Sequence, residues 1–236
     1  MKTIVQDRET VLNQAAEAIC SLLREKPDTV FTMAAGRTML PLWERLGEAV
    51  REGKVSFANA TFFQTAEFLD VPEEKSLRHM TEENFLAKTD LKPENCRWIS
   101  WITEDNLTNL DNDIPAAGGL DLAVLGIGDN AHIGFNEPAT QYDTRCRVQK
   151  LTDKTRAQYS WLFGSAEEAP EKACTMGIHT LVEAKKIIVL ALGEEKAQAT
   201  FDMLYARDDS VIPAAFLQLP FDVTVYADSE AGDRKS

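Results

Sequence analysis

Several features that would assign a function class directly are missing from this chain of 236 residues. No stretch approaches the roughly 18 consecutive apolar residues of a membrane-crossing helix. The opening residues, MKTIVQDRETVLNQ, lack the apolar segment of a secretory signal. Positive charge is also scarce: the formal net charge is −13, whereas nucleic-acid binding needs a local excess of lysine and arginine. We therefore expect a soluble, cytoplasmic protein with no nucleic-acid or membrane partner.

Cysteine and histidine are too few and too widely spaced to predict a metal site. The chain contains four cysteines with no C-x-x-C pair, so reduced and mostly structural thiols are expected: Cys20, Cys96, Cys146 and Cys174. None of the three histidines pairs with another at i+3 or i+4, as zinc ligands on a helix would: His79, His132 and His179. The sequence thus predicts a site that works without a metal ion.

What the chain does contain is an alternation of short apolar runs and longer amphipathic segments. Helical spacing of apolar residues occurs in three segments: 8–26, 40–53 and 195–206. The apolar runs predict strands at residues 29–34, 60–64, 97–101, 121–126, 186–192 and 222–227. Strands that are apolar throughout and separated by helices are typical of a parallel sheet covered on both faces. We predict an α/β fold, a doubly wound, mostly parallel sheet with helices on both faces.

The chain shows no internal repeat and no Gly/Ser linker, so a single domain is expected over residues 1–236. The acidic, Asn-rich stretch TEDNLTNLDNDIPAAGG, residues 103–119, is interpreted as a surface loop. The C-terminal residues SEAGDRKS, 229–236, are expected to be frayed.

Residues 122–139, LAVLGIGDNAHIGFNEPA, form the least ordinary stretch of the chain. Gly126, Gly128 and Ala131 have the spacing of a dinucleotide-binding loop. However, Gly134 and Pro138 prevent the long helix that such a loop must open, and no strand ending in an acidic residue follows at the required distance. We therefore expect no nicotinamide or flavin cofactor.

The same stretch predicts an acid–base site around His132. The imidazole is bracketed by Asp129, Asn130 and Glu137, and a histidine oriented by a carboxylate acts as a general acid and base near neutral pH. The alternative is a histidine that satisfies its hydrogen bonds in a tight loop and has no chemical role. The strand-terminal Gly-x-Gly, which allows close approach of a ligand to the backbone, favours the functional interpretation.

A phosphate site is predicted at the end of the strand at residues 29–34. Gly36, Arg37 and Thr38 lead into a helix with Pro41 in its first turn, and free N–H groups plus a guanidinium suit a phosphate. The alternative is an ordinary turn with Thr38 as the N-cap. Further cations occur at another helix start, Lys196, and in the stretch TRCRVQKLTDKTR: Arg145, Arg147, Lys150, Lys154 and Arg156. For most of these a solvated face is the competing interpretation.

These residues resemble the glucosamine-6-phosphate deaminase/isomerase family, which shares its fold with 6-phosphogluconolactonases. The resemblance lies in LGIGDNAHIGFNEPA, residues 125–139, and continues in TRCRVQKLTDKTR, TMGIHTLVEAKKIIVLALGEEKAQA and IPAAFLQL. It implies a modified Rossmann-like fold and conversion of an amino-sugar 6-phosphate to a ketose 6-phosphate and ammonia. His132 would open the sugar ring with Glu137 as its partner. Phosphate would bind at Gly36, Arg37 and Thr38, with Lys196 and Arg147 as further cations.

The chain departs from the family pattern at several of these positions. Asn130 stands where the family has an acid, and the acid Asp129 lies one place earlier. The carboxylate that moves a proton from C2 to C1 falls on Ala66, with Glu67 adjacent, and a phosphate-binding arginine of the family falls on Trp161. The acidic stretch near Asp111 is too short for a helix that the deaminases carry there. We expect Glu67 or Asp129 to replace the missing base.

Four interpretations remain open on the sequence alone. An amino-sugar-6-phosphate isomerase/deaminase acting on glucosamine or galactosamine 6-phosphate is preferred, with a sugar phosphate as its partner and no cofactor. A 6-phosphogluconolactonase-type hydrolase would instead use His132 to activate water. A catalytically silent, sugar-phosphate-binding regulator would keep the pocket and lose the base, as Ala66 suggests. A scaffold that binds nothing is the simplest alternative. Members of the family are often oligomeric, so the resemblance also implies a homo-oligomer.

Overall fold

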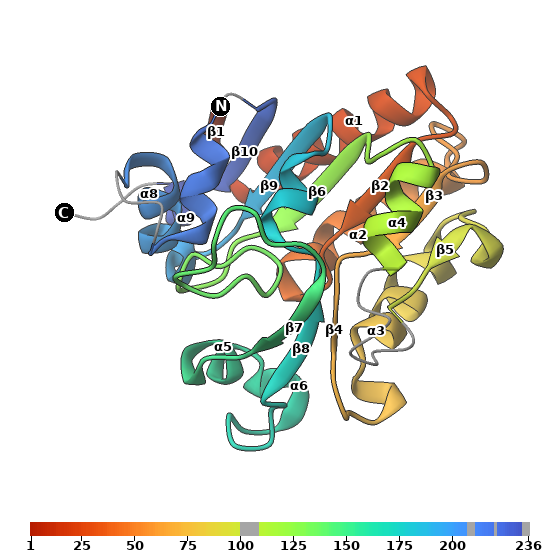
Figure 1. The fold of residues 1–236 in the computed structure, drawn as a ribbon. Coiled ribbons are helices and arrows are strands. Elements are labelled where there is room, and N and C mark those ends of the chain that lie inside the picture. The colour runs from red at the N-terminus through yellow and green to blue at the C-terminus, as the bar shows by residue number, and fades with distance from the viewer. Residues whose placement is uncertain (100–108, 207–210, 220, 233–236) are drawn as a thin grey trace.

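The structure, a computed structural model, describes residues 1–99, 109–206, 211–219 and 221–232. Its main sheet has seven parallel strands in the order β1-β10-β9-β6-β2-β3-β5 (Figure 1). These strands are β1 (Lys2–Gln6), β2 (Val30–Met33), β3 (Thr61–Gln64), β5 (Cys96–Arg97), β6 (Leu122–Gly126), β9 (Lys186–Ala191) and β10 (Val223–Asp228). The expected parallel α/β sheet is therefore confirmed.

Helices cover both faces of this sheet, as the apolar strands predict. In β6, Leu122 and Val124 pack into the hydrophobic cluster of the first two long helices, α1 (Arg8–Glu25) and α2 (Leu40–Arg51). Ala123 and Leu125 point to the opposite cluster, formed with α7 (Ile178–Val182) and α8 (Ala197–Tyr205). Side chains alternate between the two faces of a strand, so a strand buried on both faces must be apolar at every position.

Local signals in the sequence set the ends of the first two long helices. The Asp7 side chain accepts a hydrogen bond from the Thr10 backbone N–H at 3.0 Å, which caps the start of α1. Helix α2 has Pro41 in its first turn, where a missing N–H costs nothing. Gly53 follows the end of α2 with φ of 68°, a left-handed conformation that glycine adopts without strain.

A second, smaller sheet was not expected from the sequence. Its strands pair antiparallel in the order β4-β8-β7, with β4 (Ala66–Phe68), β7 (Arg147–Lys150) and β8 (Lys172–Thr175). Phe68 packs against Phe135, Tyr159 and Phe163, with ring centroids 5.0–5.2 Å apart. This sheet lies beside α3 (Leu77–Asn84), α5 (Asp153–Gln158) and α6 (Ser160–Phe163) (Figure 1).

The described part of the chain also contains short 3₁₀ helices: η1 (Arg37–Met39), η2 (Glu73–Lys75), η3 (Leu86–Lys88), η4 (Pro93–Asn95), η5 (Glu194–Lys196) and η6 (Pro213–Gln218).

Three expectations about the ends and loops need correction. The stretch 103–119 is not simply a loop, because α4 (Asn109–Ala116) forms within it and buries Leu110 and Ile114; residues 103–108 lie outside the described residues. Of the expected strand 97–101, only Arg97 belongs to β5, and 100–101 lie outside the described residues. Residues 229–232 are not frayed but form α9 (Ser229–Gly232), which buries Ala231; residues 233–236 again lie outside.

No helix in the described part of the chain combines the length and the apolar character needed to cross a membrane. The four cysteines form no disulfide and all are buried, as expected of structural cysteines.

Candidate active site

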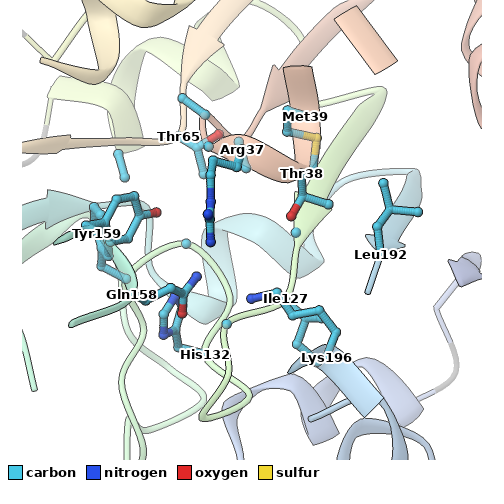
Figure 2. Close-up of a pocket in the computed structure, with 18 of the residues that line it drawn as sticks. Arg37, Thr38, Met39, Thr65, Ile127, His132, Gln158, Tyr159, Leu192 and Lys196 are labelled. Atoms are coloured by element: carbon cyan, nitrogen blue, oxygen red, sulfur yellow. The ribbon is translucent and has the colours of Figure 1, made fainter. Parts of the chain in front are cut away.

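A cavity of about 250 Å³ opens at the carboxyl ends of the central parallel strands. Its wall is formed by the segments that follow β1, β2, β6 and β9, together with residues from the small sheet and from α5 and α6 (Figure 2). Ligands of open α/β sheets bind at this edge, where helix N-termini and strand ends converge. The cavity brings together His132, Gly36, Arg37, Thr38 and Lys196, which the sequence predicts as site residues.

The segment after β2 supplies one side of the cavity. Thr38 is not the side-chain cap of α2, since that helix starts after Met39 and no side chain caps it. Instead, Thr38 lines the cavity, and Figure 2 shows its hydroxyl turned toward the interior. The guanidinium group of Arg37 extends from the same segment toward the side where Gln158 and His132 lie (Figure 2). A hydroxyl and a guanidinium are therefore both available to an anion here.

The segment after β6 places His132 in a tight loop. The Gly128 N–H donates to the His132 carbonyl at 2.9 Å, and Ala131, with φ of 61°, donates back to the Gly128 carbonyl. The imidazole lies so close to Gly128 that a Cβ there would be 2.2 Å from ring atom Cε1. The second glycine of the Gly-x-Gly motif therefore makes room for the histidine ring, and any side chain at this position would displace it.

His132 is linked to Glu137 through Asn130. The His132 Nδ1 atom lies 2.6 Å from Asn130 Oδ1, and Asn130 Nδ2 donates to Glu137 Oε2 at 2.7 Å. A carboxylate only accepts, so the amide nitrogen must face Glu137 and the amide oxygen must face the imidazole. This assignment puts the ring proton on Nδ1 and leaves Nε2 with a free lone pair. The imidazole is then set to take a proton from a ligand.

Burial controls the charge of this histidine. His132 and Glu137 are each 3 % exposed. Burial lowers the pKa of His132 to about 4, although the carboxylate of Glu137, 4.0 Å from Nδ1, acts to raise it. At neutral pH the imidazole is therefore uncharged and acts as a base. The Thr152 backbone N–H also donates to Glu137, at 3.0 Å, and holds the carboxylate in place.

Asp129 and Lys196 form an ion pair beside the histidine. Lys196 is 4 % exposed and belongs to η5, after β9, while Asp129 follows β6. Lys154 also binds this segment, donating to the Asp129 carbonyl at 2.8 Å. The ammonium group of Lys196 lines the cavity, but its charge is already offset by the Asp129 carboxylate.

Five sequence-predicted site residues lie outside the cavity wall: Asp129, Asn130 and Glu137, which act through the contacts above, and Glu67 and Arg147. Glu67 is buried, and its carboxylate accepts from the backbone N–H groups of Phe68, Leu77 and Arg78 at 2.8–2.9 Å, so it caps the start of α3. Arg147 donates to Asn136 Oδ1 at 2.9 Å and to Thr140, and thereby braces the loop that carries Glu137. The structure does not bring either side chain to the cavity.

Several lining residues were not singled out as site residues in the sequence. Arg8 begins α1 and follows β1, a strand that the apolar pattern did not reveal. Tyr159 is buried, which raises the pKa of its hydroxyl, and it faces Gly36 across the cavity. Ala66 and Trp161 line the wall, at the two positions where the family resemblance places a carboxylate and an arginine. These lining residues lie far apart in the sequence, so the sequence does not show that they meet at one cavity. The position of Arg8 at the start of a helix is the one local feature that could have indicated an anion-binding role.

The cavity has one carboxylate in its wall among the described residues, that of Glu195. The described residues contain no group of three His, Cys, Asp or Glu side chains arranged to hold a metal ion. The chemistry available at the wall is therefore that of a neutral imidazole, one carboxylate, several cations, hydroxyl groups and backbone amides.

Comparisons with known proteins agree with this geometry. A family model described as glucosamine-6-phosphate isomerases/6-phosphogluconolactonase matches residues 6–225. The chain is 37 % identical to a glucosamine-6-phosphate deaminase of Thermoanaerobacter sp. (strain X514), over 98 % of this chain and 94 % of the relative. It is 34 % identical to one of Clostridioides difficile (strain 630), over 98 % and 95 %.

Solved structures give the same picture of the fold. A structure described as a monomeric glucosamine-6-phosphate deaminase superimposes with a TM-score of 0.93 at 32 % identity, covering 98 % of both chains. A 6-phosphogluconolactonase from Thermotoga maritima gives a TM-score of 0.73 at 20 % identity, covering 96 % of this chain and 98 % of the other. The second likeness concerns the fold alone.

Proposed function

The chain belongs to the family of glucosamine-6-phosphate isomerases and 6-phosphogluconolactonases, and we propose that it acts on an amino-sugar 6-phosphate as an isomerase/deaminase. The observation that carries this proposal is the hydrogen-bonded chain from Glu137 through Asn130 to His132 at the cavity wall. Relatives above 30 % identity are named as deaminases of glucosamine 6-phosphate, and their match extends over nearly the whole chain.

Ring opening is the step for which the site is best equipped. His132 Nε2 takes the proton of the O1 hydroxyl as the bond from C1 to the ring oxygen breaks, and it returns a proton to that oxygen. The product is the open-chain aldehyde. Asn130 and Glu137 keep the imidazole in the tautomer that this step needs, and burial keeps it uncharged at neutral pH.

Proton transfer from C2 to C1, with a proton passing from the amine to O1, gives the imine of the ketose. Water then hydrolyses this imine to the ketose 6-phosphate and ammonia. In the family pattern a carboxylate carries this transfer, and its position falls on Ala66. Glu67 is engaged at the start of α3 and Asp129 in an ion pair with Lys196. We therefore propose that this transfer is the slow step, because absence of a positioned general base typically costs about 10²–10⁴ in rate.

A second candidate is a sugar-phosphate-binding protein without turnover, and Ala66 at the cavity wall is the observation that favours it. A lactonase is favoured less. It would need no base at residue 66, but the solved lactonases that resemble this chain do so at 20 % identity or below.

Two wider expectations remain proposals. We treat residues 1–236 as a single functional domain, since the family model spans residues 6–225 and the cavity draws on segments after β1 and after β9. The homo-oligomer implied by the resemblance stays a prediction, tested by light scattering of the purified chain; one similar solved structure is described as a monomeric deaminase.

The test of the proposed function is ammonia release from glucosamine 6-phosphate and galactosamine 6-phosphate. We expect measurable release by the unaltered protein and a loss of about 10²–10⁴ in His132→Ala. His79→Ala is the matched control, because His79 lies in α3 and its imidazole is 3.5 Å from Glu83, outside the cavity wall. Turnover that survives in His132→Ala at the unaltered rate contradicts the proposed role of the imidazole.

A further inference from the structure

Two arginines at the cavity wall lack a hydrogen-bonding or ion-pairing partner among the described residues. Arg8 and Arg37 both line the cavity, and neither side chain forms a hydrogen bond or ion pair with another residue that the structure describes. Each of the other arginines in the described part donates at least one hydrogen bond to a carboxylate or carbonyl oxygen. In a chain with a net charge of −13, two unpaired guanidinium groups beside one cavity form a local concentration of positive charge suited to an anion.

The packing of two helices brings these arginines to the same cavity. Arg45 of α2 donates to Asn13 of α1 at 2.8 Å and also forms an ion pair with Glu9, the neighbour of Arg8. These contacts hold the first two turns of α1 against α2. Arg8 precedes Glu9 at the start of α1, and Arg37 lies three residues before α2. The two guanidinium groups thus come from neighbouring helix starts.

Trp161 holds the second of these arginines. The guanidinium carbon of Arg37 lies 5.7 Å from the centroid of the Trp161 ring, within the range of a cation–π contact. Trp161 is 37 % exposed at the cavity wall, although a large apolar side chain gains from burial. The contact with the Arg37 guanidinium accounts for the position of the Trp161 ring. The same contact limits the orientations that the Arg37 side chain can adopt.

Lys196 is less available to an anion than these two arginines. Its ammonium group is paired with the Asp129 carboxylate, so an incoming anion must compete with a charge already in contact. The unpaired positive charge of the cavity wall therefore resides on Arg8 and Arg37.

We propose that Arg8 joins Arg37, which the family resemblance already places at the phosphate, in binding the phosphate group of the substrate, and that Trp161 is a positioning residue for Arg37. This inference rests on the proposed function, since it assigns the residues that hold the 6-phosphate. A guanidinium presents paired N–H donors that match phosphate oxygens, and two of them supply the charge that a phosphate dianion needs. Thr38 would add a hydroxyl donor from the same segment.

The test is isothermal titration with glucosamine 6-phosphate, inorganic phosphate and unphosphorylated glucosamine. We expect Arg8→Gln and Arg37→Gln each to raise the Kd for both phosphate-bearing probes by about ten- to a hundredfold, the effect of losing a charged hydrogen bond. Arg24→Gln is the matched control: this arginine pairs with Glu17 near the end of α1 and should leave the Kd unchanged. Unphosphorylated glucosamine should bind weakly and equally to all variants.

Trp161 is tested through its dependence on Arg37. We expect Trp161→Leu to raise the Kd for inorganic phosphate about two- to fivefold, and Trp161→Phe to restore most of the affinity because an aromatic face remains. In an Arg37→Gln background the Trp161→Leu change should have no further effect. An equal effect of Trp161→Leu in both backgrounds overturns the positioning role.

The outcomes also separate this inference from the proposed function. Normal ammonia release with unchanged Kd in Arg8→Gln and Arg37→Gln would overturn the inference and leave the isomerase/deaminase proposal standing. Phosphate binding that depends on both arginines, without turnover of either amino-sugar phosphate, would support the inference and contradict the isomerase/deaminase proposal. No binding of inorganic phosphate or sugar phosphate by the unaltered protein would overturn the inference.

Discussion

Replacing Ala66 with aspartate should supply a carboxylate at the position where the family resemblance places the base for proton transfer. Ala66 belongs to β4, is 7 % exposed and lines the cavity, so an aspartate there directs its carboxylate into the same space without a change in backbone. The strand pairing of β4 with β8 uses backbone atoms and should be unaffected. We expect ammonia release from glucosamine 6-phosphate to rise by about 10²–10⁴, the usual contribution of a positioned general base.

The cost of this substitution is modest by comparison. A polar side chain placed at a partly solvated cavity wall, without all of its hydrogen-bond partners, typically lowers the free energy of unfolding by about 1–3 kcal/mol. Arg37 and Lys196 on the same cavity favour the ionised form of the new carboxylate. Ala66→Asn is the matched control, since it has nearly the same shape and no basicity. If Ala66→Asp folds and binds substrate but is no faster than Ala66→Asn, a base at residue 66 is not what limits the proton transfer.

Three further predictions concern ionisable side chains near the cavity. Glu67→Gln should lower the free energy of unfolding by about 1–3 kcal/mol, because Glu67 caps the start of α3. It should leave the Kd for sugar phosphate unchanged, and a tenfold change in that Kd, measured by titration, would contradict a purely structural role. The pKa of His132 is about 4 in the folded chain and about 6.5 in the unfolded chain, so the unfolded chain binds a proton at higher pH. The free energy of unfolding should therefore fall by up to about 3 kcal/mol as the pH drops from 6.5 to 4. Urea denaturation of the unaltered chain and His132→Gln at pH 7 and pH 4.5 measures this, and an equal pH dependence in both would refute it. Asp129→Asn should release Lys196 and tighten the binding of inorganic phosphate in titration calorimetry; weaker binding would show that Asp129 does not compete with the anion.

The main sheet was predictable because its strands are apolar on both faces. The runs around β2, β6, β9 and β10 carry that pattern, and the structure forms strands there. The small sheet was not predictable, because AEF, RVQK and KACT are short, partly polar, and stable only through pairing with segments far away in sequence. Helix α4 was missed for a related reason: Leu110 and Ile114 are its only large apolar anchors in a strongly polar stretch.

Some contacts of the candidate site could likewise be predicted from the sequence, and others could not. His132, Asn130 and Glu137 lie within eight residues of one another, so their contact could be anticipated from a single motif. The capping role of Glu67 could not, because its donors lie ten and eleven residues further along, at the start of α3. Arg8 reaches the cavity only through β1 at the sheet edge and through the packing of α1 on α2. The strand order and helix packing that bring Arg8 to the cavity cannot be seen in any local sequence pattern.

The most direct test of the account is proton NMR of glucosamine 6-phosphate and galactosamine 6-phosphate with the protein in D₂O. One spectrum series follows both the interconversion of anomers, which requires ring opening, and the loss of the C2 proton. We predict that the protein accelerates anomer interconversion, that C2 exchange is much slower, and that both rates fall in His132→Ala. Anomer interconversion no faster than in buffer, for both sugars, would contradict ring opening at His132 and with it the central claim.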